Sequence, residues 1–255
     1  MPSPQFSSNH VVLVTGASLG IGAETAVEFA RRGAKVAVHY NSSKAQAEDV
    51  AARIEKFDGK AWLFQADVSD PAQARDLSKR VLETCGRVDT LVNNAGSLVE
   101  RRPFLELTDD LWRKIIDINV SSVIWVSQSI ARHMKERGSG SIINLGSIAG
   151  HNGGGPGAMP YATSKAAVTC MTKGMAKELI PFGIRVNAVN PGVILTPFHE
   201  RFTNDENMKK MVGMIPQGRA GTADEIAGVI AFLASKDASH IVGESIEVNG
   251  GMLMD

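Results

Sequence analysis

The stretch Val11-Val-Leu-Val-Thr-Gly-Ala-Ser-Leu-Gly-Ile-Gly22 joins a short apolar run to a turn that contains three glycines. The run Val11–Val14 holds no polar residue, which is typical of a strand buried on both faces of a sheet. After the turn, Ile21, Thr25 and Phe29 follow the spacing of an amphipathic helix. A strand, a glycine turn and a helix in this order predict the start of an α/β fold with a parallel sheet.

The alternation of apolar strands and helices continues along the rest of the chain. Further strands are expected at Lys35–Val38, Ala61–Gln65, Thr90–Val92, Ser141–Leu145, Arg185–Ala188 and Ser245–Val248. Helices are expected between them at Ala45–Phe57, Pro71–Cys85, Asp109–Arg137, Tyr161–Phe182 and Ala223–Ala234. Because no linker-like composition divides these elements, residues 1–255 are expected to form one doubly wound α/β domain around a mostly parallel seven-stranded sheet with helices on both faces.

Composition and charge narrow the classes of partner. The 27 basic and 27 acidic residues give a net charge of zero, which removes the bulk electrostatic basis for binding nucleic acid or an anionic membrane. The apolar runs are strand-sized, and no basic segment precedes a long apolar run, so we expect no membrane span, no signal peptide and a cytoplasmic location. Cys85 and Cys170 lie far apart without other ligands nearby, so neither a disulfide framework nor a metal site is expected.

The glycine turn is a candidate site for a dinucleotide pyrophosphate. Gly16 allows the tight turn, Gly20 lets a phosphate approach the backbone, and Gly22 lets the helix pack against the strand. The N-terminus of the following helix adds free N–H groups and positive partial charge. Residues of the turn expected to line the cofactor are Gly16, Ser18, Leu19, Gly20, Ile21 and Gly22. The alternative is a glycine turn that binds nothing.

The end of the second expected strand bears on the choice of cofactor. In dinucleotide folds, an acidic residue at this place binds the ribose 2′-hydroxyl and selects NAD. Here the window His39–Lys44 contains no carboxylate, and it offers hydrogen-bond donors and a lysine. We therefore favour NADP(H), with NAD(H) left open, and an ordinary polar loop is the alternative. The candidate contacts are Tyr40, Asn41, Ser42 and Ser43.

Two Tyr-x-x-x-Lys pairs occur, but only one lies in an expected helix. Tyr161 and Lys165 are one helical turn apart, whereas Tyr40 and Lys44 lie where a strand passes into a loop. A phenol has a pKa near ~10 and needs nearby positive charge to exchange protons at neutral pH. Tyr161 is therefore the candidate general acid for reducing a carbonyl, and the base for the reverse reaction.

Ser147 follows the expected strand Ser141–Leu145 and lies at the edge where open α/β sheets bind ligands. Its hydroxyl is placed to hold a substrate oxygen beside Tyr161. The alternative is a strand-end hydroxyl that caps the next segment.

These motifs together resemble the short-chain dehydrogenase/reductase family over nearly the whole chain, which implies a Rossmann fold and NAD(P)-dependent oxidoreductase activity. The matching motifs are Thr15–Gly22, Asp67-Val68, Asn93-Asn-Ala-Gly96, Asn119, Ser147, Tyr161 with Lys165, and Pro191-Gly192 through Thr196.

The resemblance assigns further roles. It implies that Asp67, with Val68 beside it, contacts the adenine. Asn94 and Ala95 would position the strand and the cofactor ribose, and Ile194 and Thr196 would hold the nicotinamide carboxamide. Further residues implied to bind the cofactor are Gly96, Pro191 and Gly192. Lys165 would hold the nicotinamide ribose, and Asn119 would anchor a water that links Lys165 to solvent. The resemblance also implies a homotetramer, with Ile246–Asp255 at a subunit contact.

Two subfamilies share local features with this chain. The run Gly146–Ala158 resembles the NADPH-dependent reductases of 4-deoxy-5-hexoseulose uronate, and Arg101 and Arg102 would then pair with a substrate carboxylate, with His151 as a further candidate. Arg132 lies where 3-oxoacyl-ACP reductases place a carrier-binding arginine, although Phe182 stands at the position of their second arginine.

The leading functional hypothesis is an NADP(H)-dependent enzyme that transfers hydride between nicotinamide and a small-molecule carbonyl or secondary alcohol, with a keto-uronate or another sugar acid as the candidate substrate. The alternatives are a 3-oxoacyl-ACP reductase, an NAD-dependent sugar or alcohol dehydrogenase, and a nucleotide-sensing protein without catalysis. Leu195–Thr222, rich in methionine and charge, is expected to be an irregular segment that closes over the nicotinamide side.

Overall fold

The computed structural model describes residues 5–254 and is built around one seven-stranded sheet in which every paired strand is parallel. The strand order is β3-β2-β1-β4-β5-β6-β7, as expected for a doubly wound fold. Residues 1–4 and Asp255 lie outside the described residues. Asp255 is the last residue of the tail Ile246–Asp255, for which a subunit contact is expected.

All seven expected strands are present. Their bounds are β1 Val11–Val14, β2 Lys35–Tyr40, β3 Ala61–Gln65, β4 Thr90–Asn93, β5 Gly140–Leu145, β6 Ile184–Pro191 and β7 Ser245–Val248. The α-helices are α1 Gly20–Arg31, α2 Lys44–Glu55, α3 Pro71–Cys85, α4 Asp109–Ile116, α5 Ser122–Arg137, α6 Ala149–Asn152, α7 Met159–Leu179, α8 Pro197–Phe202, α9 Asp205–Gly213 and α10 Ala223–Ala234. No helix of the described residues is long and apolar enough to cross a membrane.

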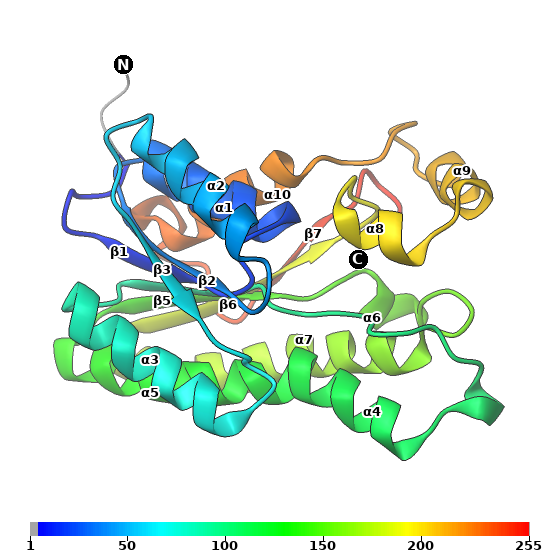
Figure 1. Cartoon of the computed structure of the whole chain (residues 1–255), viewed down its shortest axis with the longest axis horizontal. Coiled ribbons are helices and arrows are strands. Elements are labelled where there is room, and N and C mark those ends of the chain that lie inside the picture. The colour runs from blue at the N-terminus through cyan, green and yellow to red at the C-terminus, as the bar shows by residue number, and fades with distance from the viewer. Residues whose placement is uncertain (1–4, 255) are drawn as a thin grey trace.

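Helices cover both faces of the sheet and form two separate cores. Figure 1 shows α1, α2 and α10 on one face and α3, α5 and α7 on the other. Phe29 and Val38 belong to the core of the first face, and Leu91 and Met134 belong to the core of the second. Because successive residues of a strand face opposite cores, an uninterrupted apolar strand is what this arrangement requires.

The strand order reverses between β1 and β4, which are neighbours in the sheet although β2 and β3 lie between them in sequence. From β1 the chain proceeds outward to β2 and β3, then returns to β4 on the other side. The loops that leave β1 and β4 therefore separate to opposite faces and open a crevice at the carboxyl ends of the strands. This is the place where open α/β sheets bind ligands.

Two expectations about the helices are wrong. The helix expected over Asp109–Arg137 is interrupted by a π-helical turn at Asp117–Ser121, which divides it into α4 and α5. The irregular stretch expected at Leu195–Thr222 contains α8 and α9. The N-cap of α9 is Asn204, whose side chain accepts a hydrogen bond from the Asn207 N–H at 2.9 Å. The α9 helix has no buried residue and therefore no apolar periodicity by which it could be recognised.

The packing of α1 against the first turn gives a test of the fold. A Cβ on Gly22 would lie 2.2 Å from the Gly16 carbonyl oxygen and 2.4 Å from Nδ2 of Asn94. We expect Gly22→Ala to lower the free energy of unfolding by at least about 2 kcal/mol, because backbone must move to admit the methyl group. Chemical denaturation measures this change.

Gly228→Ala, within α10, is the matched control, because nothing lies within 4 Å of the Cβ it would add. It is expected to raise the free energy of unfolding by up to about 1 kcal/mol through helix propensity. Equal effects of the two substitutions would contradict the close packing at Gly22.

Candidate active site

The turn after β1 is held from the side by the loop after β4. The Asn94 side-chain amide donates to the carbonyl oxygens of Thr15 and Gly16, both at 2.9 Å. In return, the Thr15 hydroxyl oxygen accepts from the backbone N–H groups of Asn94 and Ala95, at 3.0 and 3.1 Å. These four bonds fix the two loops at the switch point to one another. Asn94 and Ala95 therefore lie beside the glycine turn, and their contact with the cofactor ribose stays a prediction.

The turn itself has the geometry of a phosphate site. Gly16 and Gly20 have φ angles of +63° and +55°, which side chains disfavour, and α1 begins at Gly20. Its free N–H groups suit an anion. A Cβ on Gly20 would lie 3.4 Å from the side chain of Thr196, so Thr196 faces the turn from across the crevice. Donors and dipole of this kind fit the pyrophosphate of a dinucleotide.

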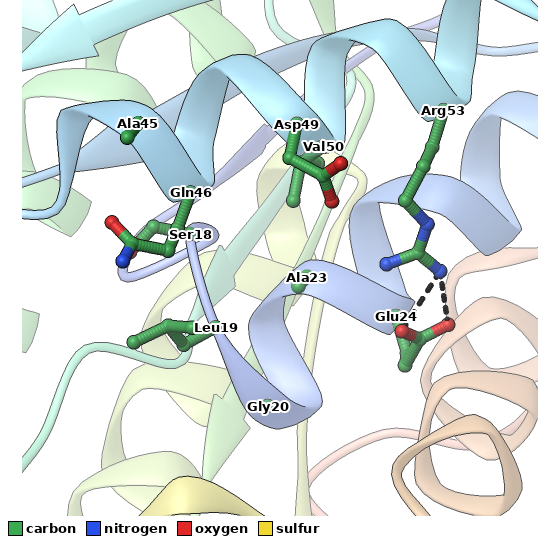
Figure 2. Close-up of a pocket in the computed structure, with 10 residues that line it drawn as sticks. All are labelled: Ser18, Leu19, Gly20, Ala23, Glu24, Ala45, Gln46, Asp49, Val50 and Arg53. Carbon is green, nitrogen blue, oxygen red and sulfur yellow. Dashed lines mark hydrogen bonds and ion pairs between the residues drawn. The ribbon is translucent and has the colours of Figure 1, made fainter.

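A cavity of about 340 Å³ opens beside this turn, between α1 and α2 (Figure 2). Ser18, Leu19 and Gly20 form one end of it, and Arg53 donates two hydrogen bonds to Glu24 at the other, at 2.7 and 2.8 Å. The cavity adjoins the cofactor turn and does not include Tyr161 or Ser147. Its place next to the turn suits the adenosine end of a dinucleotide, and its only arginine is already paired with Glu24.

The window at the end of β2 divides into buried and accessible residues. His39 and Tyr40 are buried, whereas Asn41, Ser42 and Lys44 are exposed and Ser43 is half-buried. Lys44 lies 3.6 Å from Glu48 in an exposed ion pair. Tyr40 is part of the core of the first sheet face, so its ring is a packing element. The exposed residues of this window are therefore Asn41, Ser42 and Lys44, and the lining of the cavity includes the next residue, Ala45.

The segment after β3 is also ordered by local hydrogen bonds. One carboxylate oxygen of Asp67 accepts from the backbone N–H and the hydroxyl of Ser69, at 2.9 and 2.6 Å. Val68 is buried against the second core. The half-buried Asp67 lies next to the end of β2, because the Ala66 N–H donates to the Tyr40 carbonyl. An adenine contact by Asp67 stays a prediction, and the placement agrees with it.

Ser147 and Tyr161 meet at the carboxyl end of β5. Tyr161 lies in the first turn of α7, and Ser147 follows β5 directly. Burial raises the pKa of the Tyr161 phenol to about 12, and a hydrogen bond with the Ser147 side chain opposes this shift. The Ser147 hydroxyl also accepts from the Ala149 N–H at 3.1 Å, so this serine caps the next segment, and its contact with a substrate oxygen stays a prediction. Without a cofactor the chain thus keeps Tyr161 protonated.

Lys165 is almost completely buried, one turn after Tyr161 on α7. Its ammonium donates to the Leu145 carbonyl oxygen at 2.7 Å and lies 5.7 Å from the centre of the Tyr161 ring. Burial lowers the pKa of Lys165 to about 8. A lysine is costly to bury with one carbonyl as partner, so its position beneath Tyr161 indicates a functional constraint.

Asn119 lies in the π-helical turn, and the turn explains its orientation. Its amide donates to the carbonyl oxygens of Ser97 and Ile115, at 2.7 and 2.8 Å, and its oxygen accepts from the Ser97 N–H at 3.0 Å. A Cβ on Gly96 would lie 2.7 Å from the Asn119 oxygen and 3.3 Å from the Lys165 nitrogen. Gly96 therefore allows Asn119 and Lys165 to approach the same point. π turns inside helices are frequent at functional sites.

The segment after β6 closes the other side of the crevice. Ile194 is buried and pairs with Gly221 as an isolated bridge, which brings the two ends of Leu195–Thr222 together. The Phe198 ring of α8 lies 5.6 Å from the ring of Tyr161. Figure 1 shows α8, α9 and α6 gathered at one end of the molecule. Pro191 and Gly192 are at the end of β6, where the Ile148 N–H donates to the Pro191 carbonyl at 3.1 Å.

The three substrate candidates are engaged with other protein groups. Arg102 is paired with Glu100. Arg101 donates to the carbonyl oxygens of Phe202 and Pro156, at 2.8 and 3.0 Å, and so ties α8 to the loop before α7. His151 contacts Glu247 at 3.3 Å. Arg101 contacts the end of α8, the helix whose Phe198 lies beside Tyr161, and a substrate carboxylate would have to compete with these partners.

Together these groups define an oxidoreductase of the dinucleotide-binding class, with a cofactor cradle and a Ser-Tyr-Lys set at one sheet edge. A family model described as Enoyl-(Acyl carrier protein) reductase matches residues 16–253. The chain belongs to the short-chain dehydrogenase/reductase family and is an NAD(P)-dependent oxidoreductase.

Similar proteins support this placement. The chain is 41% identical over 244 residues to an uncharacterized oxidoreductase of Methylorubrum extorquens. The match covers 95% of this chain and 97% of that oxidoreductase. It is 40% identical over 242 residues to the 3-oxoacyl-(acyl-carrier-protein) reductase FabG of Staphylococcus aureus, with the same coverage. A blue fluorescent protein from a metagenomic library, solved in complex with NADPH, is similar in structure with a TM-score of 0.90 and 36% identity, over 96% of this chain and 98% of that one.

Sequence reasoning missed three residues that shape the site. Thr15 and His39 act through tertiary hydrogen bonds that no local pattern reveals, and Phe198 reaches Tyr161 from a helix that was not expected. Thr15 belongs to the glycine-turn motif Thr15–Gly22, but the motif does not show which groups its hydroxyl binds. The Asn204-Asp-Glu206 start signal could have indicated α9.

The buried Lys165 predicts a dependence of stability on pH. Between pH 8 and 10.5 the folded chain has released the proton that the unfolded chain still holds, so raising the pH stabilises the folded state. Lys165→Met lacks this gain. We expect the free energy of unfolding of wild type to rise relative to Lys165→Met by about 2 to 3 kcal/mol across this window. Denaturant titrations at several pH values measure the difference.

Lys173→Met serves as the control, because Lys173 is exposed on the same helix. Its difference from wild type is expected to stay constant with pH. A difference for Lys165→Met that is equally constant would show that burial leaves the pKa of Lys165 unchanged.

Proposed function

We propose that the protein is an NADP(H)-dependent reductase of small-molecule carbonyl compounds. The observation that carries this proposal is the Tyr161 phenol, hydrogen-bonded to Ser147 and one helical turn from the buried Lys165. These three groups lie at the sheet edge that also carries the glycine turn, so a cofactor in the turn reaches them along the same crevice. Reduced nicotinamide supplies the hydride for such a reaction.

Side chains of the protein would donate the proton that the carbonyl oxygen needs and would replace it afterwards. Ser147 and Tyr161 donate hydrogen bonds to the carbonyl oxygen, which polarises the bond and orients it. Tyr161 is protonated because burial raises its pKa, so it can give its proton to the oxygen as negative charge develops there. Lys165 favours the phenolate that remains and supplies the proton that restores the phenol, and Asn119 and Gly96 lie beside the ammonium, where a proton from solvent replaces the one that Lys165 gives. In reverse, Tyr161 is the base for alcohol oxidation.

The preference for NADP(H) rests on the groups at the end of β2. Asn41, Ser42 and Lys44 are exposed there, and the window holds no carboxylate that would bind a 2′-hydroxyl and repel a phosphate. The NADPH complex of the similar blue fluorescent protein agrees with this choice. NAD(H) with a sugar or alcohol substrate is the alternative, because the catalytic groups serve either cofactor.

For the substrate, the partners of the two arginines favour a 3-oxoacyl thioester or a similar small ketone over a keto-uronate. Arg101 and Arg102 are occupied by protein oxygens, and the Phe198 ring presents an apolar surface beside Tyr161. The 40% identity to FabG points the same way. A keto-uronate is the second candidate, since Arg101 contacts the end of α8, the helix whose Phe198 lies beside Tyr161.

The remaining elements of the proposal concern motion, assembly and location. The segment 195–222, with α8 and α9, is proposed as a substrate lid on the rest of a single cofactor-binding domain. A homotetramer in the cytoplasm is proposed from the family resemblance, with β7 at a subunit contact. A role in nucleotide sensing without catalysis is disfavoured by the catalytic set at Ser147, Tyr161 and Lys165.

Replacing the proposed acid tests the function directly. We expect Tyr161→Phe to lower carbonyl turnover by about 100-fold or more, because the proton donor is lost. The Kd for NADPH is expected to stay within about threefold, since the ring remains in place. Steady-state NADPH oxidation and fluorescence titration measure the two quantities. Turnover that survives the substitution would rule out Tyr161 as the acid.

A comparison of substrates tests the proposed substrate class. We expect kcat/KM to be at least about tenfold higher for an acetoacetyl thioester than for a keto-uronate, which corresponds to about 1.4 kcal/mol of transition-state binding. The reverse order, lost on Arg101→Met or Arg102→Met, would establish the keto-uronate assignment. A panel without any turnover, together with NADPH binding, would favour the sensing alternative.

A further inference from the structure

His39 lies between the two loops that are proposed to hold the cofactor. It is the residue before the last of β2, and only 1% of its surface is exposed. Its Nδ1 lies 2.9 Å from the backbone nitrogen of Gly16, in the turn after β1. Its Nε2 lies 3.1 Å from the carbonyl oxygen of Ala66, at the start of the segment after β3. One imidazole thus spans from the phosphate turn to the segment of Asp67.

The two partners fix the protonation state of the ring. A backbone N–H can only donate, so Nδ1 must be unprotonated to accept from Gly16. A carbonyl can only accept, so Nε2 must carry the hydrogen that goes to Ala66. Burial lowers the pKa of His39 to about 4, which agrees with a neutral ring at physiological pH. His39 is therefore neither a cation nor an accessible donor for the cofactor phosphate.

The first peptide groups of the turn are held from two sides. The Gly16 N–H is bound by His39, and the Gly16 carbonyl is bound by the Asn94 amide at 2.9 Å. The backbone carbonyl of His39 also accepts from the Ala17 N–H at 2.8 Å. Gly16 adopts a φ of +63°, so its orientation depends on such contacts more than that of a residue in a strand.

We propose that His39 is a positioning residue for the cofactor, which sets the phosphate turn and the adenine-side segment relative to each other through its two ring nitrogens. The turn and the segment that His39 positions would bind the pyrophosphate and the adenine, which NADPH and NADH share. His39 should therefore affect NADPH and NADH binding equally, and it should leave the hydride-transfer step unchanged.

Three substitutions separate the two ring contacts. His39→Leu removes both hydrogen bonds and leaves the buried Gly16 N–H without its acceptor. His39→Asn keeps an acceptor near the place of Nδ1, and His39→Gln keeps a donor near the place of Nε2. Fluorescence titration gives the Kd for NADPH and for NADH, and thermal unfolding of the protein without cofactor reports stability separately.

For His39→Leu we expect both Kd values to rise by about tenfold or more, with their ratio unchanged within about twofold. The kcat at saturating NADPH is expected to stay within about threefold of wild type. His39→Asn should recover most of the affinity through Gly16, and His39→Gln less. His10→Leu is the matched control, because His10 contacts Thr90 at 3.0 Å at the opposite end of the sheet and should alter the melting temperature without changing either Kd.

Three results would overturn the proposal. A rise in the NADPH Kd alone would make His39 part of the 2′-phosphate site. Wild-type affinity for both cofactors in a destabilised His39→Leu variant would make it a packing residue only. If His39→Leu does not fold, the comparison of His39→Asn with His39→Gln decides, because equal Kd values for these two would show that the Gly16 contact has no effect on binding. Failure of wild type to reduce any carbonyl would refute the proposed function and leave these binding results valid.

Discussion

The interaction on which the site depends is the double hydrogen bond from the Asn94 amide to the carbonyl oxygens of Thr15 and Gly16. It joins the loops after β1 and β4, the two neighbouring strands between which the strand order reverses. The bond leaves little space around it, so α1 can approach only through a glycine at position 22. The requirement for glycine at position 22 follows from this packing.

The catalytic edge is constrained in a similar way. Lys165 is buried beneath Tyr161 with the Leu145 carbonyl as its partner, and Gly96 leaves the space in which Lys165 and Asn119 come close. The π-helical turn at Asp117–Ser121 directs Asn119 inward. A lysine whose pKa is lowered by burial and a tyrosine whose pKa is raised form a pair that can exchange protons once charge develops nearby. Burial of the Lys165 ammonium lowers the free energy of unfolding at neutral pH, and groups with pKa values shifted in this way are common at catalytic sites.

Most of the fold could be predicted from the sequence, because most strands have an apolar run without polar alternation and most helices have their own periodicity. The comparisons confirm the family, and the structure brings Ser147, Tyr161 and Lys165 together as their spacing predicted. The interruption at Asn119 and the helices α8 and α9 could not be predicted in the same way, since neither depends on a periodic apolar face. The partners of Arg101, Arg102 and His39 arise between segments distant in sequence, and no local pattern encodes them.

The proposed cofactor site is one crevice that begins between the loops after β1 and β4 and continues to the segment after β6. Hydrogen exchange of backbone amides, followed with and without NADPH, is the sharpest test of this arrangement. New protection is expected at Gly16–Gly22, at Asn94–Gly96 and at Gly192–Thr196, which lie along that crevice. Protection confined to the outer cavity between α1 and α2, with no change after β4 and β6, would show that the cofactor does not lie in this crevice.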